Sequence, residues 1–445
     1  MLRKIGVILF ISFMTVVIST AENIWYVTTW TKSPGRYTIT NATQKSVLYV
    51  AAASNTTTFE DGALSFAINT SGGGTSLHLN SAVGVVDLRD IIIDIKGVRY
   101  PITKLSISNY AFKDCKSITE FYANNVTAIG SLAFSRSSCK NIHISGSATT
   151  LPNGFSYSNS TNRRGVFSDC TSLTNIFLDI PLTFIGEAAF INAKNLKGDL
   201  SNIVRKSVTE IGNGAFVDCL LLTGKVEVAS LKTLGVKAFS GCGVQDVVLS
   251  CTDAFKSFSS GSASGGLAYG IFSPCNNLTN LEIHAVNFTS LGSNNLDVKT
   301  PLKRLVINSK SFTTINVESP YYGFSKLSTL KELFFGSTNF VSITGHSGSL
   351  TFTLQELTFN GRASQAAVDN LLKKVTASSG DKNCIIYAQR GSSMEWASKT
   401  APFVESELSA NIPVNCFGVY RNDSRKAWLV HRPSPFEDHT VFSLQ

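Results

Sequence analysis

The sequence predicts an α/β-type repeat solenoid flanked by two regions that do not repeat. A motif centred on Phe recurs about every 23 residues, and a short apolar alternation recurs after it. The chain of 445 residues is also longer than one compact core usually organises. A unit of this size cannot bury its own apolar face, so successive units must stack. We therefore expect a long surface rather than a single pocket.

The first motif is Ala-Phe-x-x-Cys. It is complete at residues 111–115, 215–219 and 238–242, and it has Val or Ile in place of Ala at 166–170 and 271–275. Ala133-Phe134 and Ala189-Phe190 keep the first half of the motif without the Cys. The Phe residues follow one another at intervals of 22, 33, 23, 26, 23 and 33 residues. These intervals indicate one repeat unit with insertions.

Two further motifs accompany the first. The pattern L-x-x-L-x-Φ, where Φ is apolar, occurs at residues 173–178, 278–283, 302–307, 330–335 and 354–359. Its alternation predicts a short strand with every second residue buried. An Ile-Gly pair precedes the next Ala-Phe at Gly130, Gly186 and Gly212, with Leu234-Gly235 as a variant. Because glycine has no side chain, we expect a sharp backbone turn at this position.

The three motifs together resemble the BspA-type leucine-rich repeats, a family of bacterial and protist surface proteins. The resemblance runs from about Thr103 to about Gly361. It implies a leucine-rich-repeat, right-handed solenoid with a parallel β-sheet face, in a secreted or surface-attached protein that often acts in adhesion. After Phe272 the Phe motif fades while the strand motif persists, so the later repeats depart from the family pattern.

The first 21 residues have the pattern of a secretory signal peptide. Arg3 and Lys4 precede an apolar run from 5 to 18, and small residues end the segment at Ala21. About 14 apolar residues are fewer than the roughly 20 that a spanning helix needs, so we expect cleavage rather than anchoring. No later segment is apolar enough to span a membrane. The mature chain is therefore expected to be soluble and exported, with no membrane span.

The remaining chain divides into three parts. Residues 22–102 are rich in Thr, Ser, Val and Ile and predict a β-rich N-terminal cap, which the open end of a stack requires. Residues 103–361 hold the repeats. Residues 362–445 predict a small α/β C-terminal domain, with a helix that begins at Ser364 and buries Ala367, Leu371 and Val375. Strands are expected there at 384–388, 416–420 and 427–431.

Nine Cys residues in an exported chain ordinarily suggest disulfides. Five of them instead keep a fixed distance of three residues from the repeat Phe: Cys115, Cys170, Cys219, Cys242 and Cys275. This periodicity favours buried thiols that pack as small apolar groups. Cys139 occupies the first Leu position of a shortened unit and Cys251 keeps no repeat position. Stacking leaves a Cys219–Cys242 bond open, and Cys384 and Cys416 could form another.

The residues that flank the buried position of each strand should face solvent. The candidate binding residues are Glu120, Tyr122, Asn141, His143, Asn175, Phe177, Lys225, Glu227, Asn280, Glu282, Arg304, Glu332, Phe334 and Glu356, and Asp246, Val248, Val306 and Thr358 share their orientation. Exposed aromatic residues among polar neighbours are typical of protein or glycan recognition. A solvated sheet stabilised by cross-strand pairs is the alternative explanation.

Charge and motifs exclude several function classes. The net charge of +9 is spread thinly, which does not favour nucleic acid as a partner. No metal-ligand spacing, P-loop, dinucleotide or hydrolase motif occurs, so we expect no cofactor and no catalysis. Cys416 with His431 or His439 and Asp438 is the one set of residues suited to a thiol hydrolase.

The leading hypothesis is a secreted or cell-surface binding protein that recognises a protein or glycan ligand, in adhesion or a related role, without catalysis. The alternative is a structural envelope or matrix component that associates with itself. A C-terminal thiol hydrolase is a third hypothesis. The sequence leaves the oligomeric state open.

Overall fold

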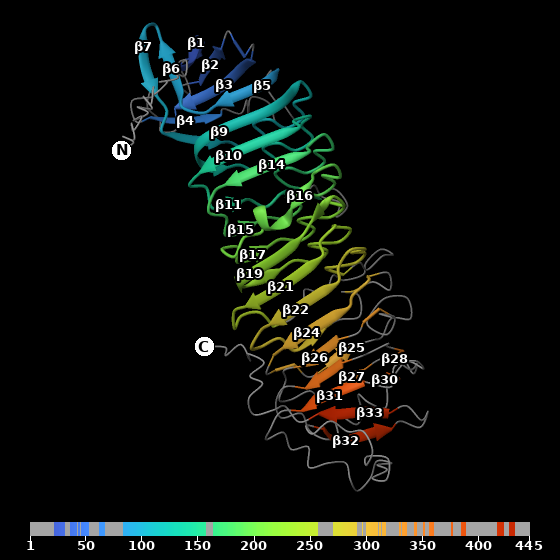
Figure 1. Ribbon diagram of the computed structural model, residues 1–445. Helices are drawn as coiled ribbons and strands as arrows, with labels where there is room; N and C mark the ends of the chain where they lie inside the picture. The colour runs from blue at the N-terminus through green and yellow to red at the C-terminus, as the bar shows by residue number, and fades with distance from the viewer. Residues whose placement is uncertain are drawn as a thin grey trace, which may run out of the picture.

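The computed structural model is an elongated stack of short strands (Figure 1). It describes residues 22–31, 36–41, 43–44, 46–52, 62–66, 83–156, 163–256, 270–291, 296, 300–309, 311–312, 314–316 and 329–330. It also describes, as backbone strands, residues 332–335, 342–344, 350–351, 356–359, 375–376, 384–388, 416–421 and 427–431. The expected signal peptide, residues 1–21, lies outside this part of the chain. Within the described part, no helix is long and apolar enough to cross a membrane.

The first sheet joins the N-terminal region to the first repeats. Among the described residues it has eleven strands, in the order β14 (Asn175–Asp179), β10 (Asn141–Gly146), β9 (Ile118–Ile129), β8 (Lys104–Ile107), β4 (Ala63–Phe66), β3 (Ser46–Ala52), β2 (Arg36–Asn41), β1 (Asn23–Thr31), β6 (Ile91–Ile95) and β7 (Val98–Pro101), with β5 (Gly84–Leu88) paired to β9. The strands from β1 to β4 pair antiparallel, whereas β8, β9, β10 and β14 pair parallel. The antiparallel strands therefore continue the sheet at the start of the repeats.

The second sheet begins in the fifth repeat unit. Its nine strands among the described residues are β19 (Lys225–Leu231), β21 (Asp246–Cys251), β22 (Asn280–His284), β24 (Arg304–Asn308), β26 (Glu332–Phe335), β29 (Glu356–Phe359), β31 (Cys384–Ala388), β33 (Ala427–His431) and β32 (Cys416–Arg421). All neighbours are parallel except β32 and β33. The parallel strands expected from the L-x-x-L-x-Φ motif are confirmed.

The α/β fold expected for residues 362–445 is not supported by the part of this region that the structure describes. The three strands expected there are present, but β31 continues the repeat sheet by pairing with β29. The reason is an unbroken apolar row, in which Leu333 pairs with Leu357, Leu357 with Ile386 and Ile386 with Val430. Val375 lies in strand β30 (Val375–Thr376) rather than in a helix, and the rest of the expected helix, including Ser364, falls outside the described residues.

Short strands lie in the segments between the long strands. They are β11 (Thr150–Leu151), β15 (Phe184–Ile185), β17 (Glu210–Ile211) and β20 (Thr233–Leu234) in one sheet; β12 (Phe155–Ser156) with β13 (Arg163–Arg164); β16 (Gly198–Asp199) with β18 (Leu222–Thr223); β23 (Ser290–Leu291), β25 (Thr314–Asn316) and β27 (Ser342–Thr344); and β28 (Leu350–Thr351) with β30. The repeat glycines follow β15, β17 and β20.

The expected turns are present, because the carbonyl of each repeat glycine accepts a hydrogen bond from the backbone nitrogen three residues later. What requires glycine at these positions is close approach of the neighbouring repeat. A Cβ on Gly212 would lie 2.5 Å from the backbone nitrogen of Glu187 in the preceding repeat. Gly130, Gly186 and Gly235 meet the backbone of the preceding repeat in the same way. None of the four has the positive φ that favours glycine. Their role is to let successive repeats stack closely.

The Phe of each repeat stacks on the Phe of the next. Ring centroids from Phe112 through Phe134, Phe167, Phe190, Phe216 and Phe239 to Phe272 lie 5.1–5.7 Å apart with interplanar angles of 3–19°. All seven rings are buried. A second stack joins Phe255, Phe288 and Phe312 at 6.0 and 5.7 Å. It begins at Phe255 and continues past Phe272, after which the sequence motif fades, so the later repeats keep an aromatic core at another position.

No α-helix occurs among the described residues, so the α/β character expected of the repeats is wrong there. The Phe-bearing segments are turns. The residue two positions after six of the seven stacked Phe residues has a positive φ of 55–67°, at Asp114, Arg136, Asp169, Asn192, Asp218 and Gly241. Five of these six are Asp, Asn or Gly, the residues that tolerate this conformation best. A residue with this φ interrupts an α-helix, which explains why the segments stay turns.

The prediction of buried thiols is confirmed. Cys115, Cys139, Cys170, Cys219, Cys242 and Cys275 are buried and form no disulfide, so Cys219 and Cys242 are not bonded to one another. The thiols of Cys170, Cys219 and Cys275 donate to the carbonyl of the Phe in the preceding repeat, at 2.9, 3.1 and 3.0 Å. The Cys position is therefore both a packing group and a link between repeats.

The register of the last strands does not fit a Cys384–Cys416 disulfide. Strand β33 lies between β31 and β32, with Cys384 opposite Trp428 and Cys416 opposite His431. Two strand spacings separate backbones by about 9–10 Å, whereas the Cα atoms of a disulfide lie within roughly 7 Å.

Candidate binding face

We call the surface formed by the outward side chains of the parallel repeat strands the strand face. On β9, β10 and β14 the register places Glu120, Asn141 and Asn175 in one row and Tyr122, His143 and Phe177 in the next. We call these the amide row and the aromatic row. The residues between them, such as Phe121 and Ile142, are buried. The six candidate residues of these strands therefore lie together on one surface, as the alternation predicts.

The aromatic row is a chain of tilted ring contacts. The Tyr122 and His143 centroids are 6.4 Å apart with an interplanar angle of 59°, and those of His143 and Phe177 are 5.8 Å apart at 50°. Such tilted pairs are favourable because the positive edge of one ring meets the negative face of another. Phe177 ends the row and is 60% exposed. The row therefore holds Phe177 in place while leaving its ring open to solvent.

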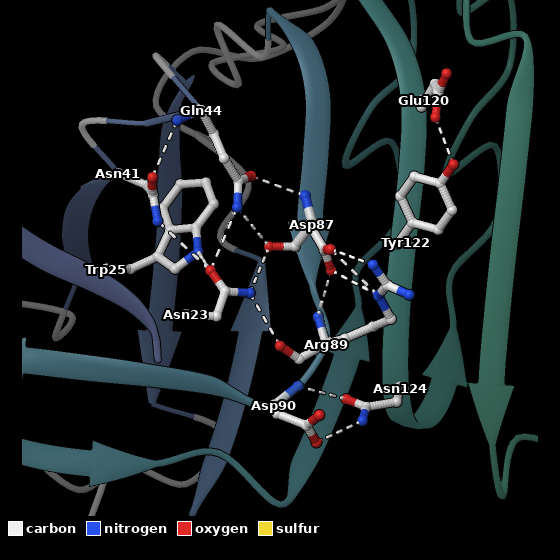
Figure 2. Close-up of polar contacts among 10 residues, drawn as sticks. All are labelled: Asn23, Trp25, Asn41, Gln44, Asp87, Arg89, Asp90, Glu120, Tyr122 and Asn124. Atoms are coloured by element: carbon white, nitrogen blue, oxygen red, sulfur yellow. Dashed lines mark hydrogen bonds and ion pairs between the residues drawn. The ribbon is translucent and has the colours of Figure 1, made fainter. Parts of the chain in front are cut away.

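A cation already occupies the other end of the row. The Arg89 guanidinium carbon lies 4.8 Å from the Tyr122 ring centroid. Its Nε donates to Asp87 Oδ1 at 3.0 Å, and its Nη2 pairs with Oδ2 of the same carboxylate at 2.5 Å (Figure 2). The Asp87 hydrogen bond raises the pKa of Arg89. The Tyr122 hydroxyl donates to Glu120, which raises the pKa of Tyr122.

A polar network in the N-terminal region fixes the position of Arg89. The Asn23 amide donates to the carbonyls of Asp87 and Arg89, both at 2.9 Å. Asn23 Oδ1 accepts hydrogen bonds from Trp25 Nε1 at 3.2 Å and Gln44 Nε2 at 3.3 Å. Gln44 Oε1 in turn accepts from the Asp87 backbone nitrogen at 2.8 Å (Figure 2). The segment that presents Arg89 to Tyr122 is therefore held from several strands.

Amide side chains also link neighbouring strands across the face. Asn124 Nδ2 donates to Asp90 Oδ1 at 2.8 Å, and the Asp90 backbone nitrogen donates to Asn124 Oδ1 at 3.0 Å (Figure 2). In the amide row, Asn175 Nδ2 donates to Asn141 Oδ1 at 2.8 Å. These bonds restrain the outward side chains on each side of the aromatic row.

The strand face is interrupted after β14. In place of a long strand, the next repeat unit forms a 3-10 turn, η1 (Leu200–Asn202), which lies between β14 and β19 in Figure 1. Asp199 caps the turn by accepting from the Ser201 backbone nitrogen at 2.8 Å. Leu200 is buried, and so are the following Ile203 and Val204. The turn thus fills the core that a strand would fill while breaking the row of outward residues.

Two basic residues after η1 connect it to the strands on either side. Arg205 donates to the Leu178 carbonyl at 2.8 Å and lies 3.9 Å from the Asp179 carboxylate of β14. Lys206 pairs with Glu227 of β19 at 2.7 Å. The break is therefore a structured joint between two segments of the face.

The second segment of the face consists of charged pairs. Lys225 lies 2.8 Å from Glu227, and hydrogen bonds from Lys206 and then Lys225 lower the pKa of Glu227 to about 2. On β22, Glu282 accepts from Asn280 at 3.2 Å and lies 3.3 Å from His284 and 3.6 Å from Arg304. The His284 hydrogen bond is the main cause that lowers the pKa of Glu282. The carboxylates of Glu227 and Glu282 are thus both paired with side chains within the face.

The candidate residues further along are placed by register alone. Glu332 and Glu356 continue the row of Arg304, and Phe334 is opposite Val306. The side chains of Glu332, Phe334 and Glu356 lie outside the described part of the structure. Val306 was expected to face solvent but is 4% exposed. Strand β24 therefore departs from the expected alternation at this position.

Sequence reasoning missed residues that complete the first segment. Strand β5 adds Val85 to the amide row and Asp87 to the aromatic row, and Arg89 follows it. These residues carry no repeat motif, although the alternation of Gly84–Leu88 was a signal for a strand. Asp179, two residues beyond Phe177 on β14, could have been found by extending the same alternation.

Little supports a catalytic site. The register places Cys416 opposite His431, but their side chains, together with His439 and Asp438, lie outside the described residues. Among the residues that the structure describes, no group of three or more His, Cys, Asp or Glu side chains could hold a metal ion.

Comparison with known proteins agrees with the repeat motifs. No curated protein matches the chain. A solved leucine-rich repeat protein from Bacteroides ovatus ATCC 8483 is 20% identical, with a TM-score of 0.38 over 72% of this chain and 84% of that one. The family model for the BspA type leucine rich repeat region (6 copies) matches residues 92–219, 155–262 and 250–367. Since these spans cover more than half of the sequence, the chain belongs to the BspA-type leucine-rich-repeat family.

Proposed function

We propose that the protein is exported and binds another macromolecule outside the cell through the first segment of its strand face, without catalysis. The observation that carries this proposal is the aromatic row, with Phe177 60% exposed at its end. Large apolar side chains held open on a surface are typical of binding sites. Leucine-rich repeats of this family suit a surface role in protein binding.

The surroundings of the row support this proposal. Binding sites combine a central aromatic anchor with a polar rim that excludes water. Here the Asp87–Arg89 and Asp179–Arg205 pairs flank the row at opposite ends. Val85, also exposed, adds an apolar side chain to the amide row beside Glu120. Because the residues sit on paired strands, little conformational entropy would be lost when a partner binds.

Export and the shape of the stack belong to the same proposal. The N-terminal apolar segment supports secretion or display on the cell surface. We also infer that residues 103–361 form one continuous right-handed solenoid, since the Phe stack runs without a gap past η1. A continuous stack would present both segments of the strand face on one side of the molecule.

Binding of the mature chain to cell surfaces and to immobilised matrix proteins and glycans tests the proposal. We expect saturable binding that Phe177→Ala weakens and that Lys225→Ala, in the second segment, leaves unchanged. Absence of binding by a folded protein would contradict it. Light scattering provides the control for the structural alternative, because large self-associated particles at low concentration would favour an envelope or matrix component.

A further inference from the structure

The two ends of the aromatic row differ in one respect. At the β5 end, Tyr122 is covered by the Arg89 guanidinium, which is also bound by the Asp87 carboxylate. The arginine comes from outside the repeats, and Asn23 holds its backbone in place. This end of the row therefore shows what group the surface accepts: a planar cation that stacks on a ring and pairs with a carboxylate beside it.

The β14 end has the same chemical components without such a cover. The Phe177 ring is 60% exposed. The Asp179 carboxylate lies two residues further along β14, and therefore on the same face, and its side chain is 79% exposed. Arg205 approaches this carboxylate only to 3.9 Å and directs its Nη2 to the Leu178 carbonyl instead. Asp179 is thus accessible to a second cation.

We propose that Phe177 and Asp179, two residues apart on β14, form a subsite for an arginine side chain of a partner protein. The ring and the carboxylate are the groups that Tyr122 and Asp87, opposite one another on β9 and β5, offer to Arg89. The inference rests on the proposed function of the strand face and names the chemistry of its partner. A guanidinium suits the site because it is planar, weakly hydrated and able to stack on a ring while it donates to a carboxylate. A lysine ammonium can lie over a ring, as Lys113 does over Tyr110, but it is compact and strongly hydrated and does not stack flat on the ring.

Retention of the mature chain on immobilised arginine, compared with immobilised lysine at the same ionic strength, tests the proposal. The full chain has a net charge of +9, and the mature chain without Arg3 and Lys4 keeps +7, which disfavours nonspecific retention on either cationic matrix. We expect stronger retention on arginine. Phe177→Ala should weaken the association about two- to fivefold, as expected for one exposed cation–π contact. Asp179→Asn should also weaken retention on arginine. Arg205→Ala should strengthen it, because Asp179 then has no competing cation nearby.

Matched controls separate a local effect from a general one. Leu221→Ala removes an apolar side chain that is 42% exposed outside the strand face, and Asp253→Asn removes an exposed carboxylate from a turn. Both should leave retention unchanged, and thermal unfolding confirms that each variant is folded. Equal retention on arginine and lysine, or equal losses in the controls, would overturn the proposal.

Two further outcomes distinguish this inference from the proposed function. If Phe177→Ala weakens binding to cells or matrix proteins but wild-type retention shows no preference for arginine, the arginine subsite is wrong and the binding face stands. If a neutral polysaccharide retards the wild type and not Phe177→Ala, the face recognises sugar and the arginine subsite is also wrong. If neither variants nor probes reveal binding at this face, both proposals fail.

Discussion

The two segments of the strand face rest on similar cores and differ on their surfaces. The first, on β9, β10 and β14, presents tilted aromatic rings and amides, and it ends in an exposed Phe177. The second, on β19, β22 and β24, presents carboxylates that are already paired with Lys206, Lys225, His284 and Arg304. Stacking constrains the inward positions of every repeat, whereas the outward positions can diverge.

The 3-10 turn η1 is the boundary between these segments. It interrupts the outward rows, yet the Phe167, Phe190 and Phe216 rings below it stay stacked at 5.1 and 5.3 Å. The chemical character of the outward side chains therefore changes at η1, whereas the packing of the core continues through it. The comparison predicts that both segments respond alike to changes in the core and differently to changes on the surface.

The largest expected effect concerns thiol reactivity, which should be equally low in both segments. Burial raises the pKa of Cys115 and Cys170 in the first segment, and of Cys242 in the second, to about 12. Against an ordinary value of 9.0, this lowers the reactive thiolate about a thousandfold at neutral pH. Native-state alkylation followed by peptide mass spectrometry measures the rates. Fast labelling of one segment alone would show that its core is open.

A core substitution beneath η1 tests whether the two segments share one core. Phe190 is fully buried between Phe167 and Phe216, so Phe190→Ala should lower the free energy of unfolding by about 3–5 kcal/mol. Phe177→Ala, on the strand face, should lower the free energy of unfolding by less than about 1 kcal/mol. Urea unfolding gives both values. A loss below about 1 kcal/mol for Phe190→Ala would mean that the ring stack does not stabilise the region around η1.

The fold was readable from the sequence wherever one residue type recurs for one physical reason. Phe recurs because each ring stacks on the ring of the neighbouring repeat, and Cys recurs because its thiol packs against the neighbouring repeat. The burial of both was therefore predictable. The β5–β9 pairing was not, because Asp87 and Arg89 belong to a region without repeats. The 26-residue interval from Phe190 to Phe216 showed that residues were inserted there, but not that they would form a turn instead of a longer strand. The exposure of Phe177 was predicted; its contact with His143 depended on register.

A repeat glycine gives a smaller effect at the same joint. Gly212→Ala would place a Cβ 2.5 Å from the Glu187 backbone nitrogen, which forces neighbouring repeats apart. We expect a loss of about 1–3 kcal/mol in the free energy of unfolding, as for other overpacked positions. Gly198→Ala is the control for space, since nothing lies within 4 Å of its added Cβ, although its positive φ adds strain. Wild-type stability of Gly212→Ala would contradict the close approach of repeats.

The smallest effect comes from the ion pairs of the second segment. The pKa of Glu227 is lowered to about 2 from 4.5, so its pairs stabilise the folded state above pH 4.5, and this contribution is lost as the pH falls through about 2. Glu227→Gln should cost at most about 1 kcal/mol at pH 7, since solvent screens these exposed groups. Thermal unfolding between pH 7 and pH 3 should show the difference shrinking as the pH falls. A difference that grows on acidification would contradict the assignment.

Binding by two surface variants, one from each segment, tests the central claim most directly. The mature wild type, Phe177→Ala and Lys225→Ala are compared for binding to the cell surface or matrix protein that the wild type recognises. If the first segment is the binding face, Phe177→Ala weakens binding by about tenfold or more, as for an interface anchor, while Lys225→Ala stays within about twofold of the wild type. Loss of binding in Lys225→Ala with full binding in Phe177→Ala would contradict the account.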